Sequence, residues 1–189
     1  MDDDETRRRF EHVALPHLDA AYNLARWLTR NDQDAQDVVQ EACLRAMRYF
    51  ASFRGDQARP WLLTIVRHTC YAWLRENRPA ELVHFDDEAG PPEAAAPPGD
   101  EPHEHAVRRA DRAQLNQAIA ALPIDFREVL VLRELEDLPY RDIARIADIP
   151  LGTVMSRLSR ARALLRVALQ PEARPRTAVL RAVRRGEAP

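Results

Sequence analysis

The sequence has no lysine, only five glycines and only two cysteines among its 189 residues. So few glycines are atypical of an all-β fold, whose many turns use glycine. Cys43 and Cys70 lie far apart and form no CxxC pair, which excludes a disulfide scaffold or a zinc finger and favours a reducing cytoplasm. Without lysine, arginine carries all the positive charge, which suits phosphate contacts but fits a coding bias equally well.

Long apolar runs are also missing. No window of about 18 residues is apolar throughout, so we expect no membrane span. The acidic start, MDDDE, is unlike the basic start of a secretory signal peptide, so we expect no signal either. Hydrophobic residues still make up 46% of the chain and charged residues 31%, which is sufficient for a packed core.

Charge is distributed unevenly along the chain. Residues 81–107 contain eight acidic residues and no arginine, whereas residues 151–189 contain nine arginines and two acidic residues. An acidic middle and a basic end are expected if only the end of the chain meets a polyanion.

A proline-rich acidic stretch over 79–107 divides the chain. It contains six prolines, and its acidic side chains repel one another, so we predict an extended flexible linker. The linker separates an N-terminal module, 6–78, from a C-terminal module, 108–170, and a basic tail follows over 171–189. Because both modules have helical hydrophobic spacing, the predicted fold class is all-α, with two small helical domains.

The N-terminal module contains an acidic helix face. Asn31 and Asp32 are predicted to start a helix over about 33–50. Within it Asp34, Asp37 and Glu41 are spaced to share one face, beside Gln40 and Leu44. Acids of this kind either stabilise the helix start or form a protein docking surface.

A second helix of this module mixes aromatic and basic residues. It is predicted to run from Pro60 to Asn77, with a buried stripe formed by Trp61, Leu62, Ile65, Thr69 and Trp73. Aromatic side chains among arginines are typical of surfaces that hold unpaired bases, although they also occur in cores edged by arginine. The core interpretation is favoured for the two tryptophans. For Arg67, His68 and Tyr71 both interpretations stay open.

The C-terminal module has the pattern of a helix-turn-helix. We predict four helices in this module. The first covers 113–121, the second starts at a cap at Asp125, the third covers 140–147 and the fourth starts at about 152. A tight turn at 148–150 joins the last two. The last helix would lie in a major groove and present its outward side chains to bases and phosphates. The alternative is an ordinary solvated arginine face. The residues predicted to point outward are Thr153, Met155, Ser156, Arg157, Ser159, Arg160 and Arg162.

Taken together, these segments resemble bacterial sigma factors of the sigma-70 family, in the short extracytoplasmic-function class. Residues 34–41, DAQDVVQE, resemble the motif that binds core polymerase. Residues 59–68, RPWLLTIVRH, resemble the helix that melts and reads the −10 element. Residues 138–144 and 150–162 resemble the reader of the −35 element. The resemblance covers about 10–78 and 113–168.

The resemblance implies a cytoplasmic protein that is not an enzyme and needs no cofactor or metal. It would bind RNA polymerase core, at the β′ clamp helices and the β flap, together with promoter DNA, under the control of an anti-sigma factor. The implied polymerase-binding residues are Asp34, Asp37, Val38, Gln40, Glu41, Leu44 and Arg45. The implied −10 contacts are Phe53, Arg54, Trp61, Thr64, Arg67, His68, Tyr71 and Arg75. The implied −35 contacts are Tyr140, Arg141, Gly152, Thr153, Met155, Ser156, Arg157, Arg160 and Arg162. The acidic linker would follow the RNA-exit path of the polymerase.

The sequence departs from the family pattern at four positions. Gln36 replaces a frequent acid, His68 a frequent asparagine and Ala72 a frequent aspartate. Met155 replaces a frequently basic residue and would contact a thymine methyl group instead of a guanine edge.

Three other interpretations are weighed against this one. The first is a helix-turn-helix regulator that acts without polymerase, with an N-terminal module that senses or dimerises. The second is a hydrolase or transferase, although no GxSxG, HExxH or P-loop pattern occurs. The third is a metal site at His103-Glu104-His105, for which two ligands are a weak basis.

Overall fold

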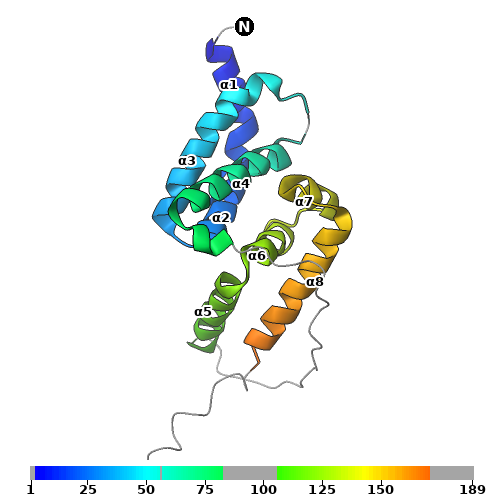
Figure 1. The fold of residues 1–189 in the computed structure, drawn as a ribbon. Coiled ribbons are helices and arrows are strands. Elements are labelled where there is room, and N and C mark those ends of the chain that lie inside the picture. Colours follow the sequence, from blue (N-terminus) through cyan, green and yellow to red (C-terminus); the bar gives the residue numbers. More distant parts are fainter. Residues whose placement is uncertain (1–2, 56, 83–105, 171–189) are drawn as a thin grey trace, which may run out of the picture.

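The computed structural model describes residues 3–55, 57–82 and 106–170, and every element in these ranges is helical (Figure 1). The first module contains α1 (Asp3–Ala14), a 3-10 turn (Leu15–His17), α2 (Leu18–Thr29), α3 (Asp32–Tyr49), a 3-10 turn (Phe50–Ser52), α4 (Ala58–Asn77) and a 3-10 turn (Pro79–Leu82). The second contains α5 (Ala106–Ala121), α6 (Ile124–Leu130), a π-helical continuation (Val131–Leu135), α7 (Tyr140–Ala147) and α8 (Leu151–Ala168). The predicted all-α class is confirmed.

The predicted linker is shorter at both ends in the structure. A 3-10 turn occupies Pro79–Leu82, and α5 begins at Ala106 instead of at 108 or later. The rest of the predicted linker, 83–105, lies outside the described residues, and so does the basic tail, 171–189. The sequence pattern also gave no separate prediction of α1.

The start of α3 follows the sequence prediction. The side chain of Asn31 accepts hydrogen bonds from the backbone N–H groups of Gln33, at 2.8 Å, and Asp34, at 3.0 Å. These bonds satisfy donors that a helix start would otherwise leave unpaired. On its inner side α3 buries mostly alanine, which brings α2 and α4 close to it. The buried residues of α3 are Ala35, Val38, Ala42 and Ala46.

Two details of α4 differ from the prediction. The helix begins at Ala58, so Pro60 is its third residue, where its missing N–H still costs no intrahelical bond. Its buried side includes Leu62, Leu63, Val66, Cys70 and Leu74, while Trp61, Ile65 and Trp73 are only half-buried. The buried surface is wider than one stripe because α4 contacts α2 and α3 on one side and α7 on the other.

The helix-turn-helix, formed by α7 and α8, follows the prediction, whereas the start of α6 before it does not. α7 has the predicted bounds, and Asp148 ends it in the left-handed conformation with φ of 54°. The expected cap at Asp125 is wrong, because Pro123 occupies the N-cap position of α6. Asp125 instead lies in the first turn, 3% exposed, where its carboxylate pairs with Arg157 at 3.6 Å.

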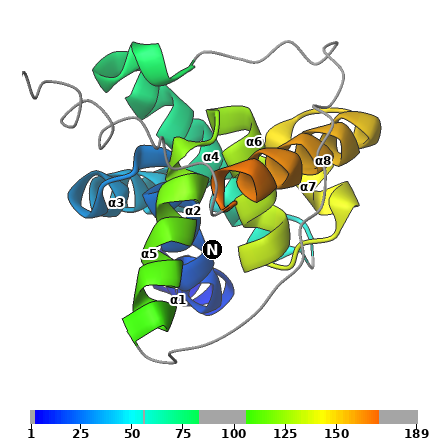
Figure 2. The ribbon, with the colours of Figure 1, turned by 90° about the horizontal axis from the view of Figure 1, so that it is seen from below.

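The two modules are packed against each other. Figures 1 and 2 show α6 and α7 turned toward the first module, where α7 packs on α4 and α6 packs on α2. One apolar cluster runs through both modules, from Leu62 and Val66 of α4 to Ile143 and Ile146 of α7. The side of α4 that faces α7 is therefore covered.

Candidate functional site

The acidic face of α3 is mostly exposed. Asp37, Gln40 and Leu44 face solvent, and Leu44 is 49% exposed. Half-buried Glu41 accepts a hydrogen bond at 2.7 Å from Nε of Arg45. A hollow of about 270 Å³ lies between this face and α4, and its lining includes Asp37, Glu41, Arg45, Trp73 and Glu76. The face thus combines negative charge with an accessible leucine.

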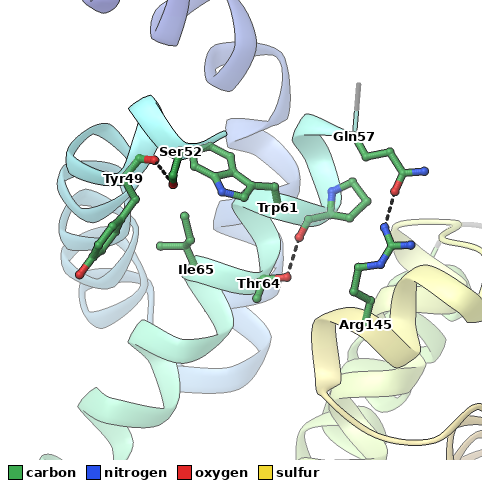
Figure 3. A pocket seen from close by; sticks show the side chains of 8 residues that line it. Tyr49, Ser52, Gln57, Trp61, Thr64, Ile65 and Arg145 are labelled. Carbon is green, nitrogen blue, oxygen red and sulfur yellow. Dashed lines mark hydrogen bonds between the residues drawn. The ribbon is translucent and has the colours of Figure 1, made fainter. Parts of the chain in front are cut away.

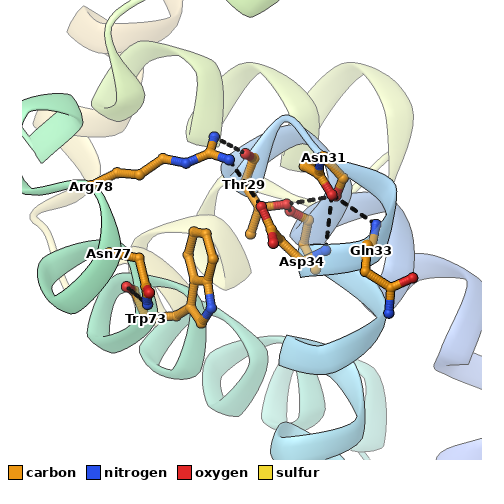
Figure 4. Close-up of polar contacts among 8 residues, drawn as sticks. Thr29, Asn31, Gln33, Asp34, Trp73, Asn77 and Arg78 are labelled. Atoms are coloured by element: carbon orange, nitrogen blue, oxygen red, sulfur yellow. Dashed lines mark hydrogen bonds and ion pairs between the residues drawn. The ribbon is translucent and has the colours of Figure 1, made fainter.

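Two residues predicted for this face are engaged within the first module, Val38 in its core and half-buried Asp34 in an ion pair. Val38 is only 2% exposed, so its side chain belongs to the core and the prediction of a surface contact there is wrong. Asp34 pairs with Nη2 of Arg78 at 2.9 Å, and Nη1 of Arg78 donates to the backbone carbonyl of Thr29 at 2.9 Å (Figure 4). The Arg78 guanidinium also lies 5.4 Å from the ring centroid of Trp73. Asp34 therefore fastens the start of α3 to the end of α4.

Aromatic rings hold the loop before α4. The ring of Phe53 lies 4.8 Å from that of Trp61, and the ring of Phe50 lies 5.9 Å from that of Phe53. Arg54, beside Phe53, is exposed. The loop therefore presents a positive side chain next to a rigid aromatic cluster.

A cavity of about 400 Å³ opens beside this cluster (Figure 3). Its lining includes the predicted residues Trp61 and Thr64, although the Thr64 hydroxyl already donates to the Pro60 carbonyl at 2.8 Å. Sequence reasoning missed Tyr49 and Ile65, which also line it. Their positions in the sequence could have indicated both residues. Ile65 lies one helical turn after Trp61, and Tyr49 is the last residue of the helix before the loop.

Arg67 and Tyr71, whose role the sequence left open, meet a carboxylate of the second module. Nε of Arg67 lies 2.5 Å from Oε1 of Glu128, and the hydroxyl of Tyr71 donates to Oε2 of Glu128 at 3.1 Å. The Arg67 guanidinium lies 4.6 Å from the centroid of the Tyr71 ring. Glu128 itself is fully buried. Of the other predicted residues of α4, His68 and Arg75 are exposed.

Burial governs the ionisation of this group. Desolvation raises the pKa of Glu128 above its ordinary value, although Arg67 acts in the opposite direction. Burial, and then the Glu128 charge, raise the pKa of Tyr71, which keeps its hydroxyl protonated and able to donate. The pKa of His68 is lowered by partial burial and by Arg67, while Asp148 in the helix-turn-helix opposes this effect.

Several predicted residues of the helix-turn-helix are accessible. Arg141 and Gly152 are exposed, Met155 is 49% exposed, and Thr153 and Tyr140 are half-buried. The guanidinium of Arg133 lies 5.4 Å from the centroid of the Tyr140 ring.

The remaining predicted residues of α8 are engaged within the protein. Ser156 is half-buried and donates to the Thr153 carbonyl at 3.0 Å. Exposed Arg162 pairs with Glu134 at 2.5 Å. The predicted outward orientation of Arg157 and Arg160 is wrong, since they are 9% and 8% exposed. Their spacing places them beside the buried stripe of Val154, Leu158 and Ala161, and buried Asp125 of α6 provides a partner for Arg157.

The described residues form neither a metal-binding cluster nor a membrane-spanning helix. No group of three or more His, Cys, Asp or Glu side chains within 3–55, 57–82 and 106–170 is arranged to hold a metal ion. The weak metal pattern at 103–105 lies outside the described residues. Within the same ranges no helix is long and apolar enough to span a membrane.

Comparison with known proteins identifies both modules. The family model for Sigma-70 region 2 matches residues 14–79, and the model for Sigma-70, region 4 matches residues 112–165. The RNA polymerase sigma-H factor of Pseudomonas aeruginosa is 36% identical over 170 residues, which cover 87% of this chain and 88% of that protein. The ECF RNA polymerase sigma-E factor of Haemophilus influenzae is 36% identical over 153 residues, which cover 78% and 80%.

Solved structures give the same assignment. The sigma factor RpoE of Bartonella quintana, crystallised with the anti-sigma factor NepR, is 27% identical and superposes with a TM-score of 0.66 over 87% of this chain and 99% of that one. CnrH, solved with the cytosolic domain of CnrY, shares the fold with a TM-score of 0.61 at 22% identity, over 88% and 94% of the two chains. With the helix-turn-helix and the acidic helix face in place, the chain belongs to the sigma-70 family of RNA polymerase sigma factors, in its extracytoplasmic-function class.

Proposed function

We propose that this sigma factor binds RNA polymerase core through the exposed face of α3 and directs initiation at promoters that it reads with both modules. The face consists of Asp37, Gln40, Glu41 and Leu44, and it suits a partner that offers positive charge and an apolar contact. Because the polymerase works in the cytoplasm, the proposal implies a cytoplasmic location.

The cavity beside Trp61 is the observation that carries the −10 part of the proposal. An unstacked base of the non-template strand would enter it and stack on the aromatic cluster, while exposed Arg54 would neutralise a neighbouring phosphate. Stacking on an aromatic side chain contributes about 1–3 kcal/mol per base, which offsets part of the cost of unpairing. His68 and Arg75 lie on the same helix and would follow the strand.

For the −35 element, the start of α8 would enter the major groove of duplex DNA. Thr153 and Met155 are accessible there, and the helix N-terminus adds partial positive charge toward phosphate. Arg141 on α7 would contact the backbone. Arg157 and Arg160 would act by holding α8 against α6 instead of by reading bases.

Control by an anti-sigma factor is also proposed. The Bartonella quintana relative was solved together with such a factor, and this chain matches almost the whole of that relative. A partner of this kind would compete with polymerase for the α3 face or with DNA for α4.

Purified polymerase core tests the proposed function. We expect the double variant Asp37→Arg with Glu41→Arg to lose co-purification with core and run-off transcription, because it reverses the charge of the α3 face. Glu5→Arg with Glu11→Arg makes the same charge change on α1 and should keep both activities. If the wild-type protein binds DNA without core and starts no transcription with it, the chain acts instead as a polymerase-independent regulator.

A further inference from the structure

We propose that Arg9 of α1 binds a phosphate of the melted non-template strand, next to the base that enters the cavity beside Trp61. The inference rests on the proposed function, because it adds a contact to the −10 site described there. Only the last residue of α1 falls within residues 14–79, which match the Sigma-70 region 2 model. The family comparison therefore assigns no role to Arg9.

Aromatic contacts join α1 to the wall of this cavity. Phe10 of α1, 9% exposed, meets the ring of Phe50 edge-on with the two centroids 5.4 Å apart. The Phe50 ring lies 6.2 Å from the ring of Trp61, which lines the cavity. Edge-to-face pairs of this kind are stabilising beyond the area that they bury. Helix α1 is therefore fixed to the same aromatic cluster that we propose to stack on an unpaired base.

Arg9 is positioned over this cluster and still faces solvent. Its guanidinium lies 5.4 Å from the centroid of the Phe50 ring, and the residue is exposed. The contact with the ring restricts the long side chain without using a hydrogen-bond acceptor of the protein, so the guanidinium N–H groups remain available to a phosphate. Arg9 is thus an oriented donor group close to the cavity.

Ion pairing within α1 distinguishes Arg9 from its two arginine neighbours. Arg7 pairs with Glu11 at 3.1 Å, and Arg8 pairs with Asp4, each one helical turn away. Among the described residues no acidic side chain forms an ion pair with Arg9. The positive charge that α1 presents beside the aromatic cluster is therefore not compensated within the described part of the chain.

The path of a melted strand explains why a cation belongs there. The rings of Phe50 and Phe53 are stacked with 17° between their planes, and exposed Arg54 follows Phe53 in the chain. An exposed arginine thus adjoins each ring of the stack. A strand whose base enters the cavity continues past this stack, and its phosphates require cations. Arginine suits this task because its planar guanidinium can donate two hydrogen bonds to one phosphate. We assign one phosphate to Arg54 and a neighbouring one to Arg9.

Neutral phosphate analogues test this contact. The full chain bound to polymerase core is titrated with promoter DNA that is premelted at the −10 element and carries one uncharged methylphosphonate linkage at successive positions of the non-template strand. We expect one linkage to weaken binding of the wild type by about fivefold and to have no further effect on Arg9→Gln, which should bind unmodified DNA about fivefold less tightly. Arg9→Lys keeps the charge and should keep the response to that linkage. The same loss at every linkage in wild type and Arg9→Gln would overturn the proposal.

Salt dependence gives a second measurement with a matched control. Arg7→Gln removes the same charge from an exposed position of the same helix, about 200° around the axis from Arg9, and should bind as the wild type does. Losing one phosphate contact to a single strand should reduce the slope of log affinity against log salt by about 0.7 for Arg9→Gln only. Equal slopes for the two variants would refute the contact. If the wild type with core does not bind the premelted DNA, the proposed function itself fails; if it binds and Arg9→Gln changes nothing, only this inference fails.

Discussion

The α3 face and the α4 face each combine charged with apolar side chains, acidic on α3 and basic on α4, but they have different environments. On α3 the acidic and apolar side chains assigned to polymerase binding remain at the surface, with Asp37 and Leu44 exposed. On α4 the side chains assigned to DNA are partly covered, because Arg67 and Tyr71 contact Glu128 of the second module. Whether a charged side chain on a helix is accessible to a binding partner or paired within the protein therefore depends on what packs against that helix.

The largest expected effect separates these two environments. Arg67→Ala leaves Glu128 buried without its cation, so we expect it to cost about 3–5 kcal/mol of unfolding free energy. Asp37→Ala removes an exposed charge and should change stability by no more than about 0.5 kcal/mol. Chemical denaturation of both variants measures the difference, and equal values would show that the ion pair between Arg67 and Glu128 does not contribute to stability.

Met155 is an accessible residue of α8, in contrast to buried Arg157 and Arg160. Met155→Arg places a guanidinium at an exposed position and should favour guanine over thymine at one −35 base by about 1–3 kcal/mol. The melting temperature should stay unchanged. Binding to duplexes that differ at single −35 positions measures the preference, and an unchanged preference would remove Met155 from the base contacts.

The starts of α3 and α4 offer a smaller contrast. Asn31 caps α3 with two hydrogen bonds, whereas no side-chain cap bond forms at Gln57 before α4. We expect Asn31→Ala to lower stability by about 1 kcal/mol. Gln57→Ala, at an exposed position, should lower it by less than about 0.5 kcal/mol. Thermal unfolding of the two variants measures both losses of stability. A larger loss for Gln57→Ala than for Asn31→Ala would contradict the prediction.

The smallest effect concerns pH. Because the pKa of His68 is lowered in the folded protein, the unfolded chain binds more protons, so His68 makes stability fall as pH drops through about 6.5. His68→Gln should make the unfolding free energy depend less steeply on pH. Some dependence should remain, because the pKa of His17 is also lowered. Denaturation at pH 7.5 and 5.5 measures the change, and an identical slope in the variant would contradict it.

Local signals predicted much of the fold. The bounds of α7, the cap at Asn31 and the end of α4 at Asn77 depend on neighbouring residues, and the structure has them as predicted. Errors arose where distant residues decide the outcome. Val38 fits an accessible position by spacing but is buried in the core, and Arg157 and Arg160 are buried although arginine usually faces water.

The sequence by itself determined most of the helices, their order, the family and the charged or aromatic character of each binding face, because helical periodicity and short motifs are local properties. It did not predict α1 or the early start of α5. Only the tertiary structure decided which charges meet. Arg67 and Glu128 are separated by 61 residues in the chain, so neither spacing nor composition pairs them. Their contact arises because apolar burial brings α4, α6 and α7 together, and a charge enclosed there must find a partner within reach.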